Sequence, residues 1–317
     1  MNEQELFALP GVVSLGIGFK NDTKELCLVV GVVEKKPISE LRPEEIIPRE
    51  MNGVRTDVIQ TGVIRAFEDP TQRFRPLVAG ISIGHKDITA GTLGCFVTKN
   101  GKSYVLSNNH VLANSNEGQI GDAIYQPGVY DGGTALDQVG TLAEFVPLNF
   151  FSIDPSDCKI SNFLVSMLNG LAKFLGSGIR FTACRVQALT NTVDCALCEM
   201  SEKHENRILE IGTPKGSAAA ILGDAVKKYG RTTLLTTGNI MQVDVTVQVA
   251  YDATGTKIGI FTGQLMAGPM SAGGDSGSAV LNMDDKVVGL LFAGSDTTTI
   301  MNPIGSVLSA LGCEIER

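Results

Sequence analysis

The sequence predicts a mainly β protein that carries a small α+β domain at its N-terminus and a helix at its C-terminus. Short runs rich in Val, Ile and Thr recur along the chain and alternate with Gly, Asn and Asp turns, a pattern typical of a β-barrel or β-sandwich. The 36 glycines favour tight turns between such strands. Only two main stretches place apolar residues at helical spacing, one between the strands and one after them.

Length and composition limit the number of domains and the kinds of partner that we expect. With 317 residues and 43% apolar residues, the chain can bury a sizeable core and hold two domains, or one domain with an appendage. A net charge of −8 without a basic stripe argues against nucleic acid as a partner. The acidic start, Met1–Glu5, is unlike a signal peptide, and no apolar run approaches the ~18 residues of a membrane span. We therefore expect a soluble, cytoplasmic protein without a membrane partner.

Residues 1–70 are expected to form a small α+β accessory domain. Two apolar runs around a polar turn predict a hairpin, a proline-led acidic stretch predicts a short helix, and a third apolar run predicts another strand. These elements are expected at Val12–Phe19, Leu26–Val33, around Pro43–Glu45, and at Val54–Ile64. The charged segment Phe67–Pro76 is the expected linker. Nothing in this domain resembles a catalytic motif.

Residues 77–317 carry strand after strand, in two sets that cover about residues 77–200 and about residues 205–312. The first set is expected at Ile81–Ile83, Thr92–Thr98, Tyr104–Ser107, Ala123–Gln126 and Gln138–Phe145. The second set is expected at Ala225–Tyr229, Asn239–Tyr251, Lys257–Leu265, Ser278–Leu281 and Val287–Phe292. Regular short strands with turn residues between them favour two barrel-like halves.

Two stretches of this region are predicted to be helical. Within an excursion over about residues 147–190, the apolar residues of Phe163–Leu175 recur at the spacing of an amphipathic helix. This helix is expected to pack over the barrel, or alternatively to act as a lid or a partner-docking element. At the end of the chain, Asn302 suits an N-cap, Pro303 the first helical position and Gly312 the C-terminal stop of a structural helix.

The segment Gly274-Asp275-Ser276-Gly277 is the most informative for function. A serine hydroxyl is a poor nucleophile unless a base and pre-aimed N–H donors accompany it, and glycine lets the backbone turn such N–H groups outward. The same residues could equally form a surface turn. All three histidines, His85, His110 and His204, precede Ser276, which excludes the Ser…Asp…His order of α/β-hydrolases. A His…Asp…Ser order remains, whereas the strand pattern does not suit the α/β fold of Asp…His…Ser enzymes.

His110 and Asp194 are the best candidates for a base and the carboxylate that orients it. His110 follows a predicted strand at a turn, whereas His85 and His204 lie in charged, turn-like contexts. Asp194 opens an otherwise apolar strand, Val193–Met200, where a carboxylate is costly unless it accepts strong hydrogen bonds. Accepting the Nδ1–H of a histidine is one such use.

The seven cysteines indicate reduced thiols. An odd number leaves at least one unpaired, and Cys195 and Cys198 lie three apart on a predicted strand, so they face opposite sides. The alternative is a zinc site formed by Cys184, Cys195, Cys198 and His204. A single Cys-x-x-Cys without a second pair supports that alternative poorly, and we expect no bound metal.

These contexts together resemble the chymotrypsin-fold serine peptidases. The segments Ser107–Leu112, Val193–Leu197 and Gly274–Gly277 are similar to the histidine, aspartate and serine motifs of that family. The second half is most similar to bacterial enzymes of the streptogrisin and α-lytic type, in Tyr229–Thr233 with Thr237–Ile240 and in the terminal helix. The form Ser-Asn-Asn-His-Val-Leu and the N-terminal unit also resemble the narrow-leaf type of plant trypsin-like proteins and their prokaryotic relatives. The resemblance covers roughly residues 78–312.

The resemblance implies a fold and a set of roles. The fold would be a chymotrypsin-like double six-stranded antiparallel β-barrel. Ser276 would attack the scissile carbonyl, and His110 would act as general base and then as general acid. Asp194 would hold the imidazolium, and the backbone N–H groups of Gly274 and Ser276 would form the oxyanion hole.

The family comparison also implies how the site is held. Secreted relatives place a cysteine directly after the histidine, but Val111 stands there, so Cys95 lacks that partner and a reducing compartment is favoured. In the bacterial type, an internal cation pairs with the aspartate before the serine. Lys228 or Arg231 would take that role for Asp275, so that the active site would form without cleavage of the chain.

The same resemblance places a substrate pocket between Met270, Ser271, Phe292 and Gly294. Met270 stands where trypsin has an acidic pocket floor, so an uncharged, apolar substrate side chain is expected. Asp296 is a nearby carboxylate that complicates this expectation.

The leading interpretation is a serine endopeptidase that acts through an acyl-enzyme on a protein or peptide, without a cofactor. The alternative is a non-catalytic trypsin-fold module that binds or scaffolds through its N-terminal domain or the 163–175 helix. An esterase with the same three residues is a third possibility. Because relatives of this kind can assemble, a homo-oligomer is a further expectation.

Overall fold

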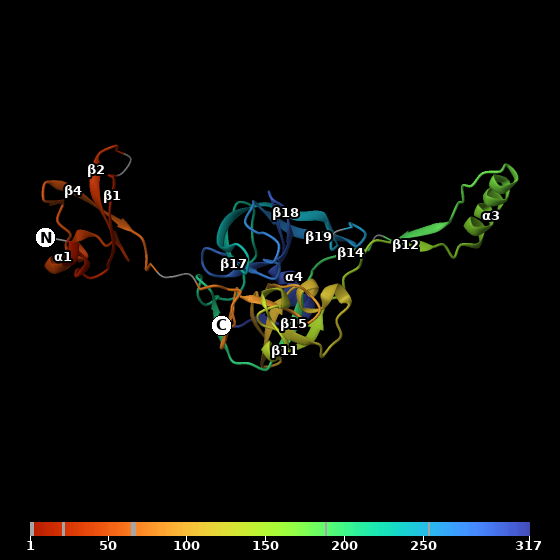
Figure 1. Ribbon diagram of the computed structural model, residues 1–317, viewed down its shortest axis with the longest axis horizontal. Coiled ribbons are helices and arrows are strands. Elements are labelled where there is room, and N and C mark those ends of the chain that lie inside the picture. Colours follow the sequence, from red (N-terminus) through yellow and green to blue (C-terminus); the bar gives the residue numbers. More distant parts are fainter. Residues whose placement is uncertain (1–2, 21–22, 65–67, 188, 253) are drawn as a thin grey trace. The chain divides into compact units, whose positions relative to one another are not determined.

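The computed structural model describes residues 3–20, 23–64, 68–187, 189–252 and 254–317, and these divide into two compact units (Figure 1). The units are Met1–Glu68 and Asp69–Arg317. Phe67, the first residue of the expected linker, lies outside the described residues. Among the described residues, no helix has the length and apolar character that a membrane span requires.

The N-terminal unit is a four-stranded sheet with short helical turns. Helix α1 (Glu3–Phe7) precedes the hairpin of β1 (Val12–Phe19) and β2 (Leu26–Val32), and the sheet has the order β1-β2-β4-β3. The crossover contains η1 (Ile38–Glu40), η2 (Pro43–Glu45) and β3 (Glu50–Met51), and β4 (Val54–Gln60) then pairs in parallel with β2. The parallel pairing explains why the chain needs a long crossover between these two strands.

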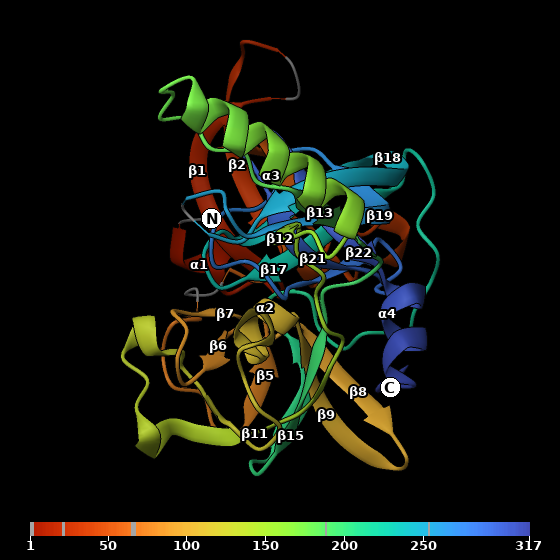
Figure 2. The same cartoon turned by 90° about the vertical axis from the view of Figure 1, so that its right-hand side faces the viewer.

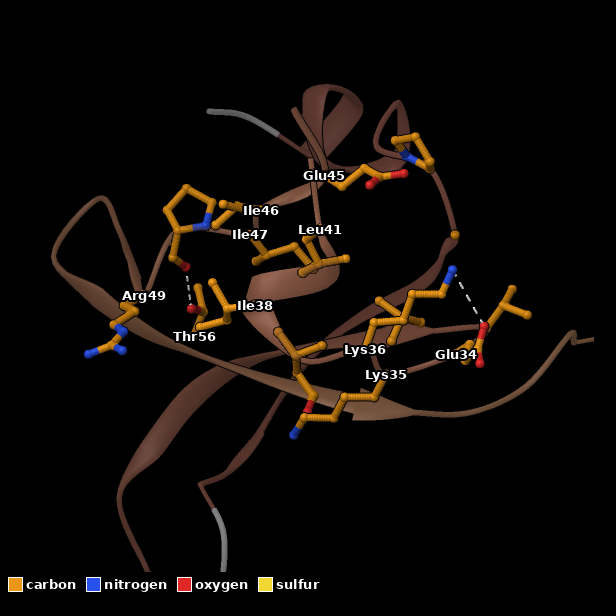
Figure 3. A pocket seen from close by; sticks show the side chains of 16 residues that line it. Glu34, Lys35, Lys36, Ile38, Leu41, Glu45, Ile46, Ile47, Arg49 and Thr56 are labelled. Carbon is orange, nitrogen blue, oxygen red and sulfur yellow. Dashed lines mark hydrogen bonds and ion pairs between the residues drawn. The ribbon is translucent and has the colours of Figure 1, made fainter. Parts of the chain in front are cut away.

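A cavity of about 610 Å³ lies in the N-terminal unit (Figure 3). Apolar side chains of the crossover, including Leu41, Ile46 and Ile47, line it against the sheet. Lys35 stands beside it and donates from Nζ to the Val58 carbonyl at 2.6 Å. Its lining contains no serine, cysteine or histidine.

The second unit contains two large, mainly antiparallel sheets. The first has the order β23-β8-β9-β15-β11-β10-β6-β7 and the second has the order β14-β19-β18-β17-β20-β21-β22. The strands of the first are β6 (Ser82–His85), β7 (Gly91–Thr92), β8 (Cys95–Lys99), β9 (Lys102–Ser107), β10 (Ala123–Tyr125), β11 (Gln138–Phe145), β15 (Ala196–Met200) and β23 (Glu314–Ile315). Those of the second are β14 (Thr190–Asn191), β17 (Ala225–Gly230), β18 (Leu234–Ala250), β19 (Ile258–Ala267), β20 (Ala279–Asn282), β21 (Val287–Gly294) and β22 (Thr299–Pro303). A further pair, β5 (Leu77–Ala79) and β16 (His204–Ile208), is parallel.

The expected chymotrypsin-like, mainly β fold is confirmed. An additional pairing of β19 with β22 closes six strands of the second sheet into a barrel. The first sheet is larger than the expected six strands because the two-residue strands β7 and β23 join it. Strand β23 comes from the end of the chain and pairs with β8, so the last residues tie the second half of the chain to the first sheet (Figure 2).

Two expectations about helices are corrected. Helix α3 (Lys159–Phe174) forms at the expected place but has no buried residue, so it does not pack over the barrel. The terminal helix α4 (Ile304–Leu311) starts after Pro303, and Asn302 is not its N-cap. Asn302 is fully buried in β22 instead, because its side chain serves the site described below. Gly312 ends α4 in the left-handed conformation, with φ of 59°.

Candidate active site

His110 and Asp194 lie side by side because their strands are paired. His110 is on the short helix α2 (Asn109–Leu112) that follows β9, and Asp194 lies just before β15. Ser107 at the end of β9 is paired with Ala196 at the start of β15. His110 Nδ1 is 2.6 Å from Asp194 Oδ2, and the His110 backbone N–H donates to Oδ1 at 3.3 Å. The carboxylate is fully buried while the imidazole is partly exposed, and His110 lines the cavity described below.

The buried Asp194 is surrounded by polar partners. The Tyr251 hydroxyl donates to Oδ2 at 2.8 Å, the Asn108 amide donates to the Asp194 carbonyl at 2.8 Å, and the Asp194 N–H donates to Asn302 Oδ1 at 3.0 Å. A buried carboxylate without such donors would cost several kcal/mol. These bonds therefore keep Asp194 in one orientation toward His110.

Tyr251 is a site residue that the sequence analysis missed. It follows β18 in the second sheet, and its ring meets the His110 ring edge-on, with centroids 5.7 Å apart. Burial, followed by the charge of Asp194, raises the pKa of Tyr251 well above its ordinary value, so the hydroxyl keeps its proton and stays a donor. The available signal was a tyrosine at the end of a long strand, but only the tertiary fold connects it to Asp194.

Ser276 lies in the turn between β19 and β20 and faces the cavity that His110 also lines. This cavity measures about 650 Å³. The Ser276 carbonyl accepts from the Thr92 N–H at 2.7 Å, which ties the turn to the first sheet. Ser276 Oγ is 3.5 Å from the Phe292 carbonyl oxygen, and within the described residues no hydrogen bond joins Oγ to His110.

Position 277 requires a glycine because the turn that carries Ser276 lies close against the first sheet. Gly277 has a φ of 94°, and a Cβ there would lie 2.1 Å from Ser107 Oγ and 2.3 Å from the Thr92 carbonyl oxygen. Both contacts are shorter than real Cβ atoms show. Any side chain would push the serine turn away from the first sheet and from His110.

The turn before Ser276 leaves two N–H groups free. In the part of the chain that the structure describes, neither the Gly274 nor the Ser276 N–H has an acceptor, whereas the Asp275 N–H between them bonds to Ala272 at 3.0 Å. Gly274 adopts a φ of 96°, which a side chain rarely tolerates. Two unpaired donors on the same turn, at Gly274 and Ser276, can bind an anion together.

The carbonyl groups of the same turn are held by threonine hydroxyls. Thr232 Oγ1 donates to the Gly273 carbonyl at 2.8 Å, and Thr92 Oγ1 donates to the Gly274 carbonyl at 2.8 Å. Because the carbonyl of one residue and the N–H of the next belong to one planar peptide, the bond to Gly273 also fixes the direction of the Gly274 N–H.

Asp275 is paired with Lys228 and not with Arg231. Lys228 Nζ lies 3.3 Å from Asp275 Oδ2, and both side chains are fully buried. Burial lowers the pKa of Lys228, opposed by the charge of Asp275. Arg231 instead donates from Nε to Asp131 at 2.7 Å. Of the two expected cations, Lys228 is thus the partner of Asp275.

Asp275 also receives backbone donors that brace the turn. Its carboxylate accepts from the N–H groups of Thr232 at 2.9 Å, Thr233 at 3.1 Å and Ala272 at 3.0 Å. The Thr233 hydroxyl donates to Oδ2 at 2.6 Å. The buried Asp275 carboxylate, with its charge paired and its oxygens hydrogen-bonded, therefore fixes the turn that carries Ser276.

The expected substrate pocket is only partly found. Ser271 and Gly294 line a cavity of about 240 Å³ next to Ser276, and Phe292 lines the neighbouring cavity that contains His110. Met270 is a correction, because its side chain is buried in the core of the second barrel and lines neither cavity. Asp296 is the one carboxylate in the smaller cavity, and it is exposed.

The structure does not gather the four residues of the zinc alternative. Cys195 and Cys198 are buried, Cys184 is exposed, and His204 pairs with Glu316 at 2.8 Å. No group of three or more metal-ligating side chains occurs among the described residues. All seven cysteines are free thiols.

Comparisons with known proteins gave one family match and several similar solved structures. Residues 174–308 match the model of the Trypsin family. Among solved structures, a glutamic acid specific serine protease is 19% identical over 76% of this chain and 100% of its own, with a TM-score of 0.48. Thermobifida fusca protease A is 17% identical over 75% of this chain and 97% of its own, with a TM-score of 0.48. Nocardiopsis protease is 15% identical over 76% of this chain and 98% of its own, with a TM-score of 0.49. No curated protein matched the chain in a further search.

The two-barrel architecture makes this a chymotrypsin-fold protein. The Trypsin match covers residues 174–308 and supports a serine peptidase, and hence a hydrolase.

Proposed function

We propose that the protein is an endopeptidase in which Ser276, His110 and Asp194 cleave a peptide bond through an acyl-enzyme. The observation that carries this proposal is the 2.6 Å contact between His110 Nδ1 and Asp194 Oδ2 beside a cavity shared by His110 and Ser276. With Nδ1–H bonded to the carboxylate, Nε2 is the ring nitrogen left to accept a proton.

The proposed reaction has two halves. Ser276 Oγ turns from the Phe292 carbonyl toward His110, transfers its proton to Nε2 and attacks the scissile carbonyl. The oxyanion accepts hydrogen bonds from the free N–H groups of Gly274 and Ser276. Collapse expels the amine with the proton from Nε2, and a water molecule, deprotonated by His110, then hydrolyses the acyl-enzyme.

The proposed cleavage site follows an uncharged residue. The smaller cavity next to Ser276 is lined by small or apolar groups such as Ala272, Leu291 and Ala293. Asp296 is exposed, so water solvates its charge and weakens any attraction for a basic side chain. A peptide series that differs only in the residue before the scissile bond tests this, and fastest cleavage after Arg or Lys would disprove it.

Labelling with a fluorophosphonate probe tests the proposed nucleophile. We expect labelling of the wild-type protein, no labelling of Ser276→Ala, and unchanged labelling of Ser306→Ala, whose serine is exposed on α4 outside both cavities. Labelling that survives in Ser276→Ala would overturn the assignment. An unlabelled wild-type protein that cleaves no peptide would favour a non-catalytic binding module. Ester hydrolysis without peptide cleavage would instead indicate an esterase.

A further inference from the structure

Helix α3 presents a continuous apolar face to solvent. It lies in the connection between β12 (Ser152–Pro155) and β13 (Cys184–Gln187), which pair as a two-stranded ribbon (Figure 1). At 100° per residue, its large apolar side chains fall on one side of the helix. All of them are exposed: Ile160, Phe163, Leu164, Met167, Leu168, Leu171 and Phe174, followed by Leu175. Phe174, for example, is 87% exposed.

The rest of the excursion contacts the polar face of α3 and leaves the apolar face open. The Asn169 side chain donates to the Phe181 carbonyl at 2.9 Å and accepts from the Phe181 N–H at 2.7 Å. The Asn162 amide donates to the Ser156 carbonyl at 2.8 Å. The returning chain is therefore bound to the side of the helix that water would solvate well. An exposed apolar face of this extent marks a site of interaction with another molecule or surface.

The charge of this segment is opposite to that of the whole chain. Residues 147–190 contain four basic residues, Lys159, Lys173, Arg180 and Arg185, and two acidic ones, Asp154 and Asp157, so their net charge is +2 (4 − 2) in a protein with a net charge of −8. All four basic residues are exposed. None of the four forms an ion pair with another described residue. Exposed cations beside an exposed apolar face complement an anionic, apolar surface.

We infer that α3 binds the surface of an anionic lipid bilayer, with its apolar face inserted at the headgroup boundary and its lysines at the phosphates. The helix has 16 residues and is thus about 24 Å long, which is too short to cross a hydrocarbon core of about 30 Å. A second copy of the chain fits the same face less well, because it would bring like charges together. The sequence led us to expect no membrane partner because no apolar run is long enough to span a bilayer and the N-terminus is unlike a signal peptide, whereas α3 would lie on the bilayer surface without spanning it.

The base of the excursion links this surface to the barrel. The Asn149 N–H donates to Asn191 Oδ1 at 2.7 Å, and the Asn191 amide donates to the Asn149 carbonyl at 2.9 Å. Next to this clamp, the ring of Phe150 contacts Tyr251 at a centroid distance of 5.3 Å. A bilayer bound by α3 would therefore be connected to the barrel through a segment that begins beside the cavity lined by His110 and Ser276.

Vesicle co-sedimentation of the full chain tests the inference without any use of catalysis. We expect the wild-type protein to sediment with phosphatidylcholine vesicles that contain phosphatidylglycerol, and at least tenfold less with phosphatidylcholine alone. Binding should weaken as salt is raised, because surface charges are screened. Circular dichroism of each variant checks that the fold is kept.

Two variants separate the apolar and the charged contributions. Phe163→Ser with Met167→Ser and Leu171→Ser removes apolar side chains that are already exposed, and Lys159→Glu with Lys173→Glu reverses two charges. Each should lower vesicle binding at least tenfold, since one basic residue near an anionic surface contributes about fivefold or more. The matched controls, the exposed Leu136→Ser and the double reversal of exposed Lys24→Glu and Lys286→Glu, should bind as the wild type does.

The outcomes decide between the possible occupants of this face. A wild-type protein that fails to bind anionic vesicles at low salt overturns the inference. So does equal binding by the triple apolar variant. If sedimentation velocity shows a wild-type dimer that becomes monomeric in the triple variant, and no vesicle binding occurs, the face is a contact between two copies and the lipid inference is wrong.

Discussion

The Tyr251 hydroxyl donates to Asp194 Oδ2 at 2.8 Å, and this bond joins the two sheets of the peptidase unit. Asp194 precedes β15 of the first sheet, whereas Tyr251 follows β18 of the second. The same oxygen contacts His110 Nδ1 at 2.6 Å. The orientation of the carboxylate thus depends on how the two barrels dock.

Tyr251→Phe should lower kcat/KM about ten- to hundredfold with little change in KM. The variant keeps the ring beside His110 but removes a hydrogen bond to a charged group, worth about 1.5–3 kcal/mol. Steady-state kinetics with a peptide substrate measure this effect. Tyr130→Phe is the control, since Tyr130 is largely exposed and should retain full activity. Unchanged kinetics in Tyr251→Phe would show that Asp194 needs no donor from the second sheet.

Lys228→Met should lower both activity and stability. It leaves the buried Asp275 without its cation, and an uncompensated buried charge costs about 3–5 kcal/mol. Because Asp275 braces the turn that carries Ser276, we expect at least a hundredfold loss of kcat/KM together with a lower midpoint of urea unfolding. The neighbouring Lys227 pairs with Asp285 at 2.7 Å, so Lys227→Met should leave kcat/KM within a few-fold. Full activity in Lys228→Met would refute the anchoring role.

Activity should fall on the alkaline side before the protein unfolds. Burial lowers the pKa of Lys228, so in the folded state it loses its proton at a lower pH than an exposed lysine, and the ion pair with Asp275 weakens there. At pH values between the lowered pKa of Lys228 and the ordinary lysine pKa, the unfolded chain binds more protons at Lys228 than the folded protein does. The contribution of Lys228 to the free energy of unfolding therefore rises with pH in this window. A pH–kcat/KM profile measured beside thermal unfolding checks this. Activity and folding that are lost together would contradict the prediction.

Thr232→Val should impair the oxyanion turn without removing either of its donors. The hydroxyl holds the Gly273 carbonyl at 2.8 Å and so directs the N–H of Gly274. Complete loss of one oxyanion donor costs about 2.7–4 kcal/mol, which sets the upper limit, and we expect a ten- to hundredfold lower kcat. Thr237→Val, on the exposed side of β18, is the control. Equal rates of fluorophosphonate labelling in both variants would exclude this role.

The cysteines should differ sharply in reactivity. Cys158 and Cys184 are exposed, and the other five thiols are buried. Hydrogen bonds from the Ser161 backbone and side chain lower the pKa of Cys158, whereas burial raises the pKa of Cys313 to about 11. Mass spectrometry after brief alkylation of the native protein should find label on Cys158 first and on Cys184 second. Rapid modification of Cys95 or Cys198 would mean that the first sheet opens.

The sequence determined the local elements and the residues that carry chemistry. Alternating apolar residues predict strands because side chains of a strand point to opposite faces. Glycine-framed turns are recognisable because few other residues accept positive φ, as at Gly274 and Gly277. The fold class followed from these patterns together with the family resemblance of the His110, Asp194 and Ser276 segments.

Only the tertiary structure decided which residues far apart in the chain meet. Lys228 and Arg231 are three positions apart and carry the same charge, yet one pairs with Asp275 and the other with Asp131. Met270 packs into a core, and Tyr251 reaches Asp194. The amphipathic pattern of α3 predicted its helix but not that its apolar face stays uncovered. Such choices depend on contacts between segments far apart in the chain, whose geometry is set when the barrels dock and not by any local period of the sequence.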